Sequence, residues 1–68
     1  MANTEAGLKI KIARIRKFMT QKEAAAELGI STSALSYYES GKRTPRDSEK
    51  QKFADFCGLS IQDLFFTV

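Results

Sequence analysis

Apolar positions recur at helical spacing along almost the whole chain, and no stretch alternates apolar and polar residues as a β-strand does. Capping residues and glycines divide this pattern into short segments. The predicted helices span residues 5–18, 21–28, about 32–40, about 47–57 and 61–65, and residues 66–68 form a tail. The pattern therefore predicts an all-α fold, a compact bundle of about five short helices.

The second predicted helix has the clearest boundaries. Thr20 and Glu23 have the spacing of a capping box, and Gly29 is a natural stop. The first helix is expected from Glu5 to Phe18. The remaining stops are Gly41 and Gly58, and the remaining N-caps are Ser31 or Thr32, Asp47 or Ser48, and Ser60.

The second and third helices are joined by a short turn around Gly29, which is the spacing of a helix-turn-helix. On the third helix, Ala34, Leu35 and Tyr38 have core spacing. The opposite face carries short polar side chains and one phenol, namely Thr32, Ser33, Ser36 and Tyr37. Such groups can contact base edges in a major groove, although a solvated Ser/Thr-rich face has the same composition.

The stretch TQKEAAAELGISTSALSYYESGKRTP, residues 20–45, resembles the Cro/phage-repressor (XRE) helix-turn-helix family in the order and spacing of its residues. The stretch GLSIQDLF, residues 58–65, is similar to the family's closing helix. The resemblance covers residues 6–65 and implies a lambda-repressor-like fold and a DNA-binding regulator of transcription. It implies that Thr32, Ser33, Ser36 and Tyr37 face the bases, and that Gln21, Ser40, Lys42 and Arg43 contact phosphates. It also implies a structural ion pair between Arg14 and Glu39.

The chain departs from the family pattern at several positions. The outer face of the third helix has no Gln, Asn, Arg or Lys, the residues that make bidentate contacts with bases. Sequence preference is then either low or dependent on DNA shape. Ala24 replaces a usual Leu and Lys50 replaces a usual apolar residue, and both changes are expected to thin the core.

Charge and composition narrow the function classes. The net charge is +3, and residues 9–22 carry six basic residues and no acid. Lys42, Arg43 and Arg46 form a second basic cluster, which favours a polyanionic partner. With no His and with Cys57 as the only cysteine, no catalytic residue, metal site, cofactor or disulfide is expected. A single domain over residues 1–68 in the cytoplasm is predicted, with no membrane partner and no small-molecule substrate.

The first helix has more apolar positions than one small core can bury. Ala6, Ile10 and Ala13 match the inward face, whereas Leu8, Ile12 and Ile15 lie roughly opposite. A misplaced helix start or a tail folded over the second face would explain this. The other explanation is a protein interface, to which Phe56, Phe66 and Val68 could add.

Two functions are therefore expected. The first is a Cro-type repressor that binds double-stranded DNA and occludes a promoter, as a homodimer or with a heterologous repressor protein. The alternative is a phage-type modulator, an anti-repressor or an antitoxin, whose main target is another protein. The basic clusters and Gln21 favour the first function, and the surplus apolar face favours the second.

Overall fold

The computed structural model describes residues 4–65, which form five α-helices and no β-strand. Their bounds are α1 (Thr4–Arg16), α2 (Gln21–Leu28), α3 (Thr32–Ser40), α4 (Asp47–Cys57) and α5 (Ile61–Phe65). The predicted all-α class and the number of helices are confirmed. None of the described helices has the length and apolar content needed to cross a membrane.

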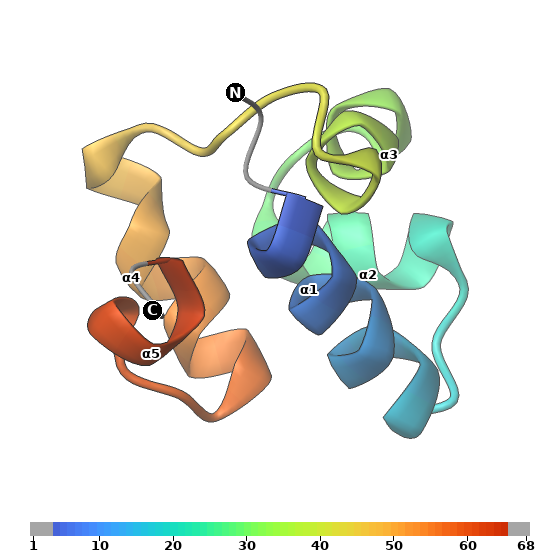
Figure 1. The fold of residues 1–68 in the computed structure, drawn as a ribbon. Coiled ribbons are helices and arrows are strands. Elements are labelled where there is room, and N and C mark those ends of the chain that lie inside the picture. The colour runs from blue at the N-terminus through green and yellow to red at the C-terminus, as the bar shows by residue number, and fades with distance from the viewer. Residues whose placement is uncertain (1–3, 66–68) are drawn as a thin grey trace.

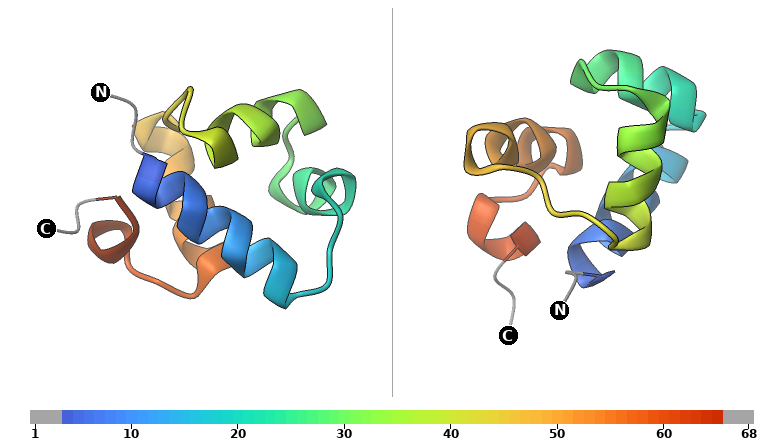
Figure 2. Two further views of the ribbon diagram at one scale, coloured as in Figure 1. Left: turned by 45° about the vertical axis from the view of Figure 1, so that its right-hand side comes forward. Right: turned by 90° about the horizontal axis from the view of Figure 1, so that it is seen from above.

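Helix α1 lies in the middle of the molecule (Figures 1 and 2). It packs against α3 on one side and against α4 and α5 on the other, while α2 packs against α3 and α4. The loop of residues 41–46 crosses from the end of α3 to the start of α4 (Figure 1). This arrangement leaves the outer face of α3 and one side of α1 open to solvent.

The core is formed by the inward faces of all five helices. Ile10, Leu35, Phe53 and Leu64 are its largest fully buried side chains. The ring of Tyr38 packs edge-on against Phe53, with centroids 5.3 Å apart. Burial of Leu35 and Tyr38 fixes which side of α3 faces inward, and therefore which side remains exposed.

Phe56 is buried rather than exposed, although it lines a pocket beside α1. It was expected to extend an exposed interface, but its side chain is buried in the core at the end of α4. The face of α4 that packs against α1 and α5 includes Phe53 and Phe56, which are three residues apart and therefore close together on a helix.

Three helices end as their glycines predict. Gly29, Gly41 and Gly58 all adopt positive φ, and each of these turns is closed by backbone hydrogen bonds to the preceding helix. At α2, for example, the Ile30 N–H donates to the Ala25 carbonyl at 3.0 Å. The caps of Thr20 and Ser60 are also present, since each side-chain oxygen accepts a backbone N–H three residues later.

Helix α1 ends two residues earlier than predicted, at Arg16. Phe18 takes the left-handed position with φ 58°, and its N–H donates to the Ile15 carbonyl at 2.9 Å. The Met19 N–H donates to the Arg14 carbonyl at 3.2 Å. These bonds have the pattern of the glycine-ended helices, so a bulky residue stands where a glycine would be unstrained.

The predicted N-cap of α4 is also wrong. Arg46 occupies that position without a side-chain cap, and its carbonyl accepts the Glu49 N–H at 2.8 Å. Asp47 lies inside the first turn, where its carboxylate is 3.1 Å from Lys50 and close to the positive end of the helix. Of the two alternatives for α3, Ser31 is the cap, since its Oγ accepts the Ala34 N–H at 3.0 Å.

Replacing Phe18 by glycine is expected to stabilise the protein. The ring is 95% exposed, so little burial is lost, while the steric cost of positive φ disappears. Glycine also has more conformational freedom in the unfolded chain, which offsets part of this gain. The net increase in the free energy of unfolding is therefore about 0.5–1 kcal/mol. Thermal unfolding by circular dichroism should show a melting temperature higher by about 2–8 °C.

Phe18→Ala is the matched control, because it removes the ring but keeps a Cβ. Its melting temperature should stay near that of the unmodified protein. If the alanine and glycine variants gained equally, the ring rather than the backbone angle would be the source of the strain.

Candidate nucleic-acid interface

Helices α2 and α3 form a corner around residues 29–31. Thr20 and Glu23 begin α2 with a reciprocal capping box, in which the Glu23 carboxylate accepts the Thr20 N–H at 2.8 Å. These hydrogen bonds hold the pKa of Glu23 below its usual value. Gly29 then turns the chain, and Ile30 is half-buried against the core. The predicted capping box and turn are confirmed, and they fix where α3 begins.

The outer face of α3 is exposed along its length. Leu35 and Tyr38 are buried and Ala34 is half-buried, which matches the predicted core positions. All four side chains that were expected to face bases are exposed, namely Thr32, Ser33, Ser36 and Tyr37. No charged residue lies on this face between Thr32 and Tyr37, so its chemistry is that of hydroxyls and one phenol ring.

Three helices meet at the carboxylate of Glu39. Arg14 donates from Nε to Oε2 at 2.7 Å and from Nη2 to Oε1 at 3.2 Å. Gln21 Nε2 donates to Oε1 at 3.0 Å. The structure thus brings together the two residues proposed as an ion pair, and the Glu39 and Arg14 side chains are only 4% and 13% exposed.

Arg14 also joins this network to the connection between α1 and α2. Its Nη1 donates to the Met19 carbonyl at 3.0 Å. Nearby, a Cβ placed on Gly7 would lie 2.7 Å from the Glu39 carbonyl oxygen and closer still to that of Tyr38. The missing side chain of Gly7 therefore lets α1 approach the end of α3 closely enough for the network to form.

A polar hollow of about 250 Å³ lies where α1, α2 and α3 meet. It brings Gln21 and Ser40, two of the expected phosphate contacts, together with Ser36 from the outer face of α3. Its remaining lining residues are Lys11, Arg14 and Glu39. Because Arg14 is already paired with Glu39, Lys11 is the cation of this hollow that is not held by the buried carboxylate.

Sequence reasoning did not single out Lys11. It was one of six basic residues between positions 9 and 22, with nothing to separate it from the others. The sequence signal that could have identified Lys11 was its spacing. It lies three residues before Arg14 and therefore shares a helix face with it.

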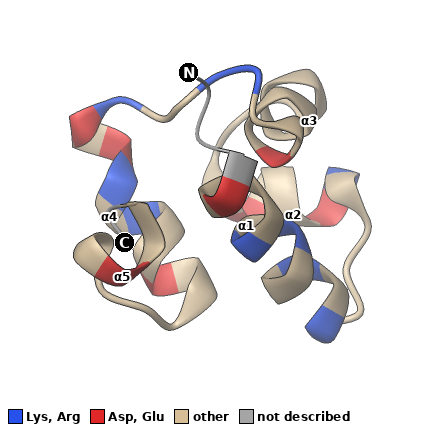
Figure 3. Cartoon of the chain, viewed as in Figure 1, with Lys and Arg blue, Asp and Glu red and all other residues tan. Residues whose placement is uncertain are grey.

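Lys42 and Arg43 lie elsewhere on the interface, in the loop that follows α3. Their N–H groups both donate to the Tyr37 carbonyl, at 3.0 and 3.3 Å, and both side chains are exposed. Ser40 Oγ donates to the same carbonyl at 3.1 Å. Basic residues thus gather on α1 and on the loop after α3 (Figure 3).

Comparison with known proteins identifies the family. The model of a helix-turn-helix family matches residues 10–64, which include α2, the turn and α3. The chain belongs to the Cro/phage-repressor (XRE) helix-turn-helix family of DNA-binding proteins. One relative of this helix-turn-helix protein is an uncharacterized HTH-type transcriptional regulator of Methanocaldococcus jannaschii. The two are 35% identical over 57 residues, which cover 84% of this chain and 86% of the relative.

Solved structures show the same fold in other helix-turn-helix proteins. The restriction-modification controller protein C.AhdI of Aeromonas hydrophila matches with a TM-score of 0.76 and 22% identity, over 91% of this chain and 94% of that one. A hypothetical transcription factor of Neisseria, NHTF, matches with a TM-score of 0.79 and 20% identity, over 97% of this chain and 76% of that one. At these sequence identities, the similarity to the two solved structures shows a shared fold and nothing further.

The helix-turn-helix protein has a second exposed feature, on α1. Leu8, Ile12 and Ile15 are 53%, 39% and 52% exposed, so the surplus apolar face of the first helix is not covered by residues 4–65. Phe66 and Val68, which were expected to add to it, lie outside the described residues. Beside this face, burial raises the pKa of the Cys57 thiol to about 11, against the opposing effect of Lys17 and Lys9. The thiol therefore stays protonated at neutral pH.

Removing the carboxylate of Glu39 is expected to destabilise the helix-turn-helix protein strongly. Glu39→Ala leaves the Arg14 guanidinium largely buried without its counter-ion, which costs about 3–5 kcal/mol. In a domain this small that is most of the free energy of unfolding. Urea unfolding followed by circular dichroism measures the loss.

The double variant Arg14→Met, Glu39→Met is the control, because it leaves no buried charge unpaired. It should recover a large part of the stability lost in Glu39→Ala. A Glu39→Ala protein as stable as the unmodified one would show that the pair is solvated.

Proposed function

We propose that this helix-turn-helix protein is a transcriptional repressor that acts by occupying a promoter, with α3 in the major groove as its recognition helix. The observation that carries this proposal is the exposed, uncharged outer face of α3, bordered by the polar hollow and by the basic loop after Gly41. Short hydroxyls allow close approach to base edges, and cations at the borders suit the phosphate backbone. We place this action in the cytoplasm, a reducing compartment in which the single cysteine, Cys57, would stay a free thiol.

Phosphate contacts are proposed for Gln21, Ser40, Lys42 and Arg43, with Lys11 added from the structure. The Ser40 hydroxyl would have to turn its one hydrogen from the Tyr37 carbonyl to the phosphate oxygen. Gln21 begins α2, where backbone N–H groups and the helix dipole favour an anion. One hydrogen of its side-chain amide is used by Glu39, so the second remains for a phosphate oxygen. Because Glu39 also holds Arg14, this contact would be positioned by the same carboxylate that fixes α3.

Sequence preference is proposed to come from Thr32, Ser33, Ser36 and Tyr37. Each hydroxyl can donate or accept, and the Thr32 methyl or the Tyr37 ring can contact a thymine methyl. A face without Gln, Asn, Arg or Lys discriminates weakly among base pairs, so DNA shape would contribute part of the preference. With so few base contacts per copy, we propose that two copies occupy half-sites one helical turn apart, about 34 Å.

A second candidate function is favoured by the uncovered apolar face of α1. Three large aliphatic side chains exposed on one small chain are typical of a protein-binding surface. The protein would then act as a modulator, for example an anti-repressor or an antitoxin, by binding another protein. Neither candidate function requires catalysis, a metal or a cofactor.

Removal of the phosphate-contacting cations should weaken binding to all DNA sequences alike. Lys42→Ala, Arg43→Ala and Lys11→Ala each remove about one released counter-ion, so the slope of log K against log salt concentration should fall by about one per substitution. Fluorescence anisotropy with two unrelated duplexes over a salt series measures this. The slope should fall together on both duplexes.

Arg16→Ala is the matched control for these variants, since it removes a cation from the side of α1 near α4 and α5. It should leave the slope nearly unchanged. If Arg16→Ala reduced the slope as much as the others, binding would depend on net charge alone and the proposed phosphate sites would be wrong.

Truncation of the outer face of α3 should change which sequences are preferred. Ser33→Ala removes an exposed hydroxyl, so the free energy of unfolding should change by less than about 0.5 kcal/mol. Tyr37→Ala removes a ring that is 43% exposed, so it should cost about 1 kcal/mol and leave the protein folded. Selection from a random duplex library should return a different preferred site for at least one variant. An identical site for both variants and the unmodified protein would count against α3 as the reading element.

A further inference from the structure

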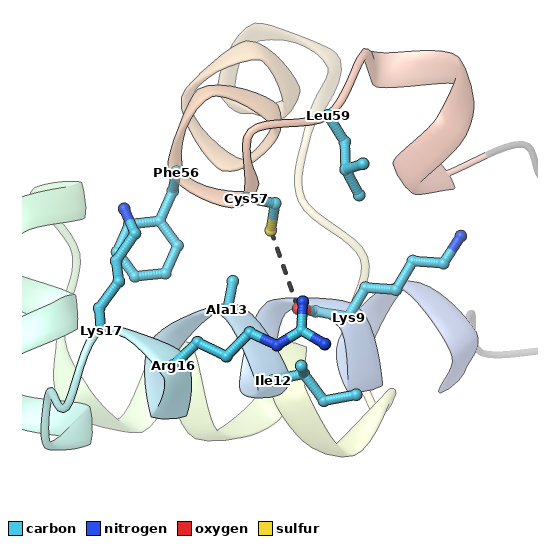
Figure 4. A pocket seen from close by; sticks show the side chains of 8 residues that line it. All are labelled: Lys9, Ile12, Ala13, Arg16, Lys17, Phe56, Cys57 and Leu59. Atoms are coloured by element: carbon cyan, nitrogen blue, oxygen red, sulfur yellow. Dashed lines mark hydrogen bonds between the residues drawn. The ribbon is translucent and has the colours of Figure 1, made fainter.

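A groove runs beside α1, on the side formed by α4 and α5 (Figure 4). It encloses about 360 Å³ between α1, the end of α4 and the connection to α5. Its apolar lining comes from Ile12, Ala13, Phe56 and Leu59. Cys57 closes the groove at the base, where its thiol approaches the Lys9 carbonyl at 4.0 Å. We call this feature the α1 groove.

The uncovered apolar face of α1 continues the α1 groove onto the helix surface. Leu8, Ile12 and Ile15 are spaced i, i+4 and i+7, so they form one stripe over about 10 Å of helix. At about 100° per residue, Lys11 lies on one edge of this stripe and Arg16 on the other. The surface is therefore an apolar seam with a cation along each side.

The charges that line the α1 groove all have one sign. Lys9, Arg16 and Lys17 belong to the lining, and no acidic side chain does. Lys17 Nζ lies 4.1 Å from the centre of the Phe56 ring, and Lys9 Nζ donates to the Asp63 carbonyl at 2.7 Å. Arg16 makes no ion pair within residues 4–65. Lys9 is also 3.8 Å from the Glu5 carboxylate, so a partner that covered the seam would meet a rim with Arg16 and Lys17 as the cations available to it.

A second copy of this chain does not fit that rim. Packing two α1 seams face to face would bring Arg16 and Lys17 of one copy close to the cations of the other, which is unfavourable. A different face of a second copy does not fit the α1 seam either. Apart from Leu59, which itself lines the α1 groove, the other exposed large hydrophobic side chains of residues 4–65 are Phe18 and Tyr37, and they form no acidic apolar stripe.

We propose that the α1 groove and seam bind an amphipathic helix of another protein, with apolar residues at i, i+4 and i+7 and Asp or Glu beside them. The apolar residues enter the groove above Phe56, and the carboxylates pair with Arg16 and Lys17. This inference deepens the second candidate function and rests on it. The α1 groove itself contains none of the proposed DNA contacts, and Lys11, at one edge of the seam, is the residue that borders both surfaces.

The test uses a hydrocarbon-stapled, fluorescein-labelled peptide with leucines at i, i+4 and i+7 and glutamates at the flanking positions. A peptide with the same leucines and lysines for glutamates is its control. The acidic peptide should bind in fluorescence anisotropy and shift the amide resonances of residues 8–16 and 56–59 in ¹⁵N spectra. Equal binding of the lysine peptide, or shifts confined to α3 and its loop, would overturn the proposal.

Two variants locate the binding surface. Arg16→Glu and Ile12→Asp should each weaken binding of the acidic peptide by about tenfold or more, because one reverses the charge of the rim and the other places a charge in the seam. Lys42→Ala is the control, because it removes a cation from the loop after α3, outside the α1 groove. It should bind the peptide as tightly as the unmodified chain does. Circular dichroism checks that the variants are folded, and Leu8→Ser replaces Ile12→Asp if the latter unfolds.

Two further measurements separate the outcomes. Analytical ultracentrifugation that showed a dimer abolished by Arg16→Glu would assign the surface to a second copy and overturn the proposal. DNA anisotropy should be unchanged for Arg16→Glu and Ile12→Asp, whereas Lys42→Ala should lose DNA affinity because it removes a proposed phosphate contact. If the unmodified protein binds DNA but not the acidic peptide, the α1 groove proposal is rejected while the repressor proposal stands. If Arg16→Glu abolishes DNA binding and leaves peptide binding intact, Arg16 belongs to the DNA interface and the α1 groove proposal is overturned.

Discussion

The carboxylate of Glu39 sets the relative positions of α1, α2 and α3. It is the one buried charged side chain among residues 4–65, and it is held by Arg14 from α1 and Gln21 from α2. A buried ion pair of this kind contributes more to positioning than to stability, since desolvation offsets much of its Coulomb energy. Its geometry is possible only because Gly7 has no side chain where α1 meets the end of α3.

The outer surfaces follow from this constraint. Once α3 is held by Glu39 on one side and by Leu35 and Tyr38 in the core, its polar face can only point outward. The same close packing turns Ile10 of α1 inward, which leaves Leu8 and Ile12 without a covering element among the described residues. The two exposed surfaces of the protein, one polar and one apolar, are thus both consequences of how α1 lies against its neighbours.

Features encoded by neighbouring residues were predictable from the sequence. Thr20 with Glu23, and the glycines that end α2, α3 and α4, act within a few residues of chain, so their patterns identify them. The end of α1 was missed because Phe18 adopts a backbone angle for which the sequence offers no glycine. Lys11 was missed and Phe56 was expected to be exposed, because the surroundings of both residues come from distant segments of the chain. Lys50, which was expected to thin the core, keeps its ammonium 3.1 Å from Asp47 and 5.3 Å from the Phe65 ring centre, while its stem is partly buried.

The difference between Phe18 and the glycines has a consequence for the order of folding. The turns after α2, α3 and α4 are closed by residues five apart, so they can form before distant parts of the chain meet. The turn after α1 carries a backbone strain that local hydrogen bonds alone offset poorly. It gains further support when Arg14 reaches the Met19 carbonyl and Glu39 together. The central helix of the finished structure is therefore expected to acquire its final end late, after the helices that surround it have begun to assemble.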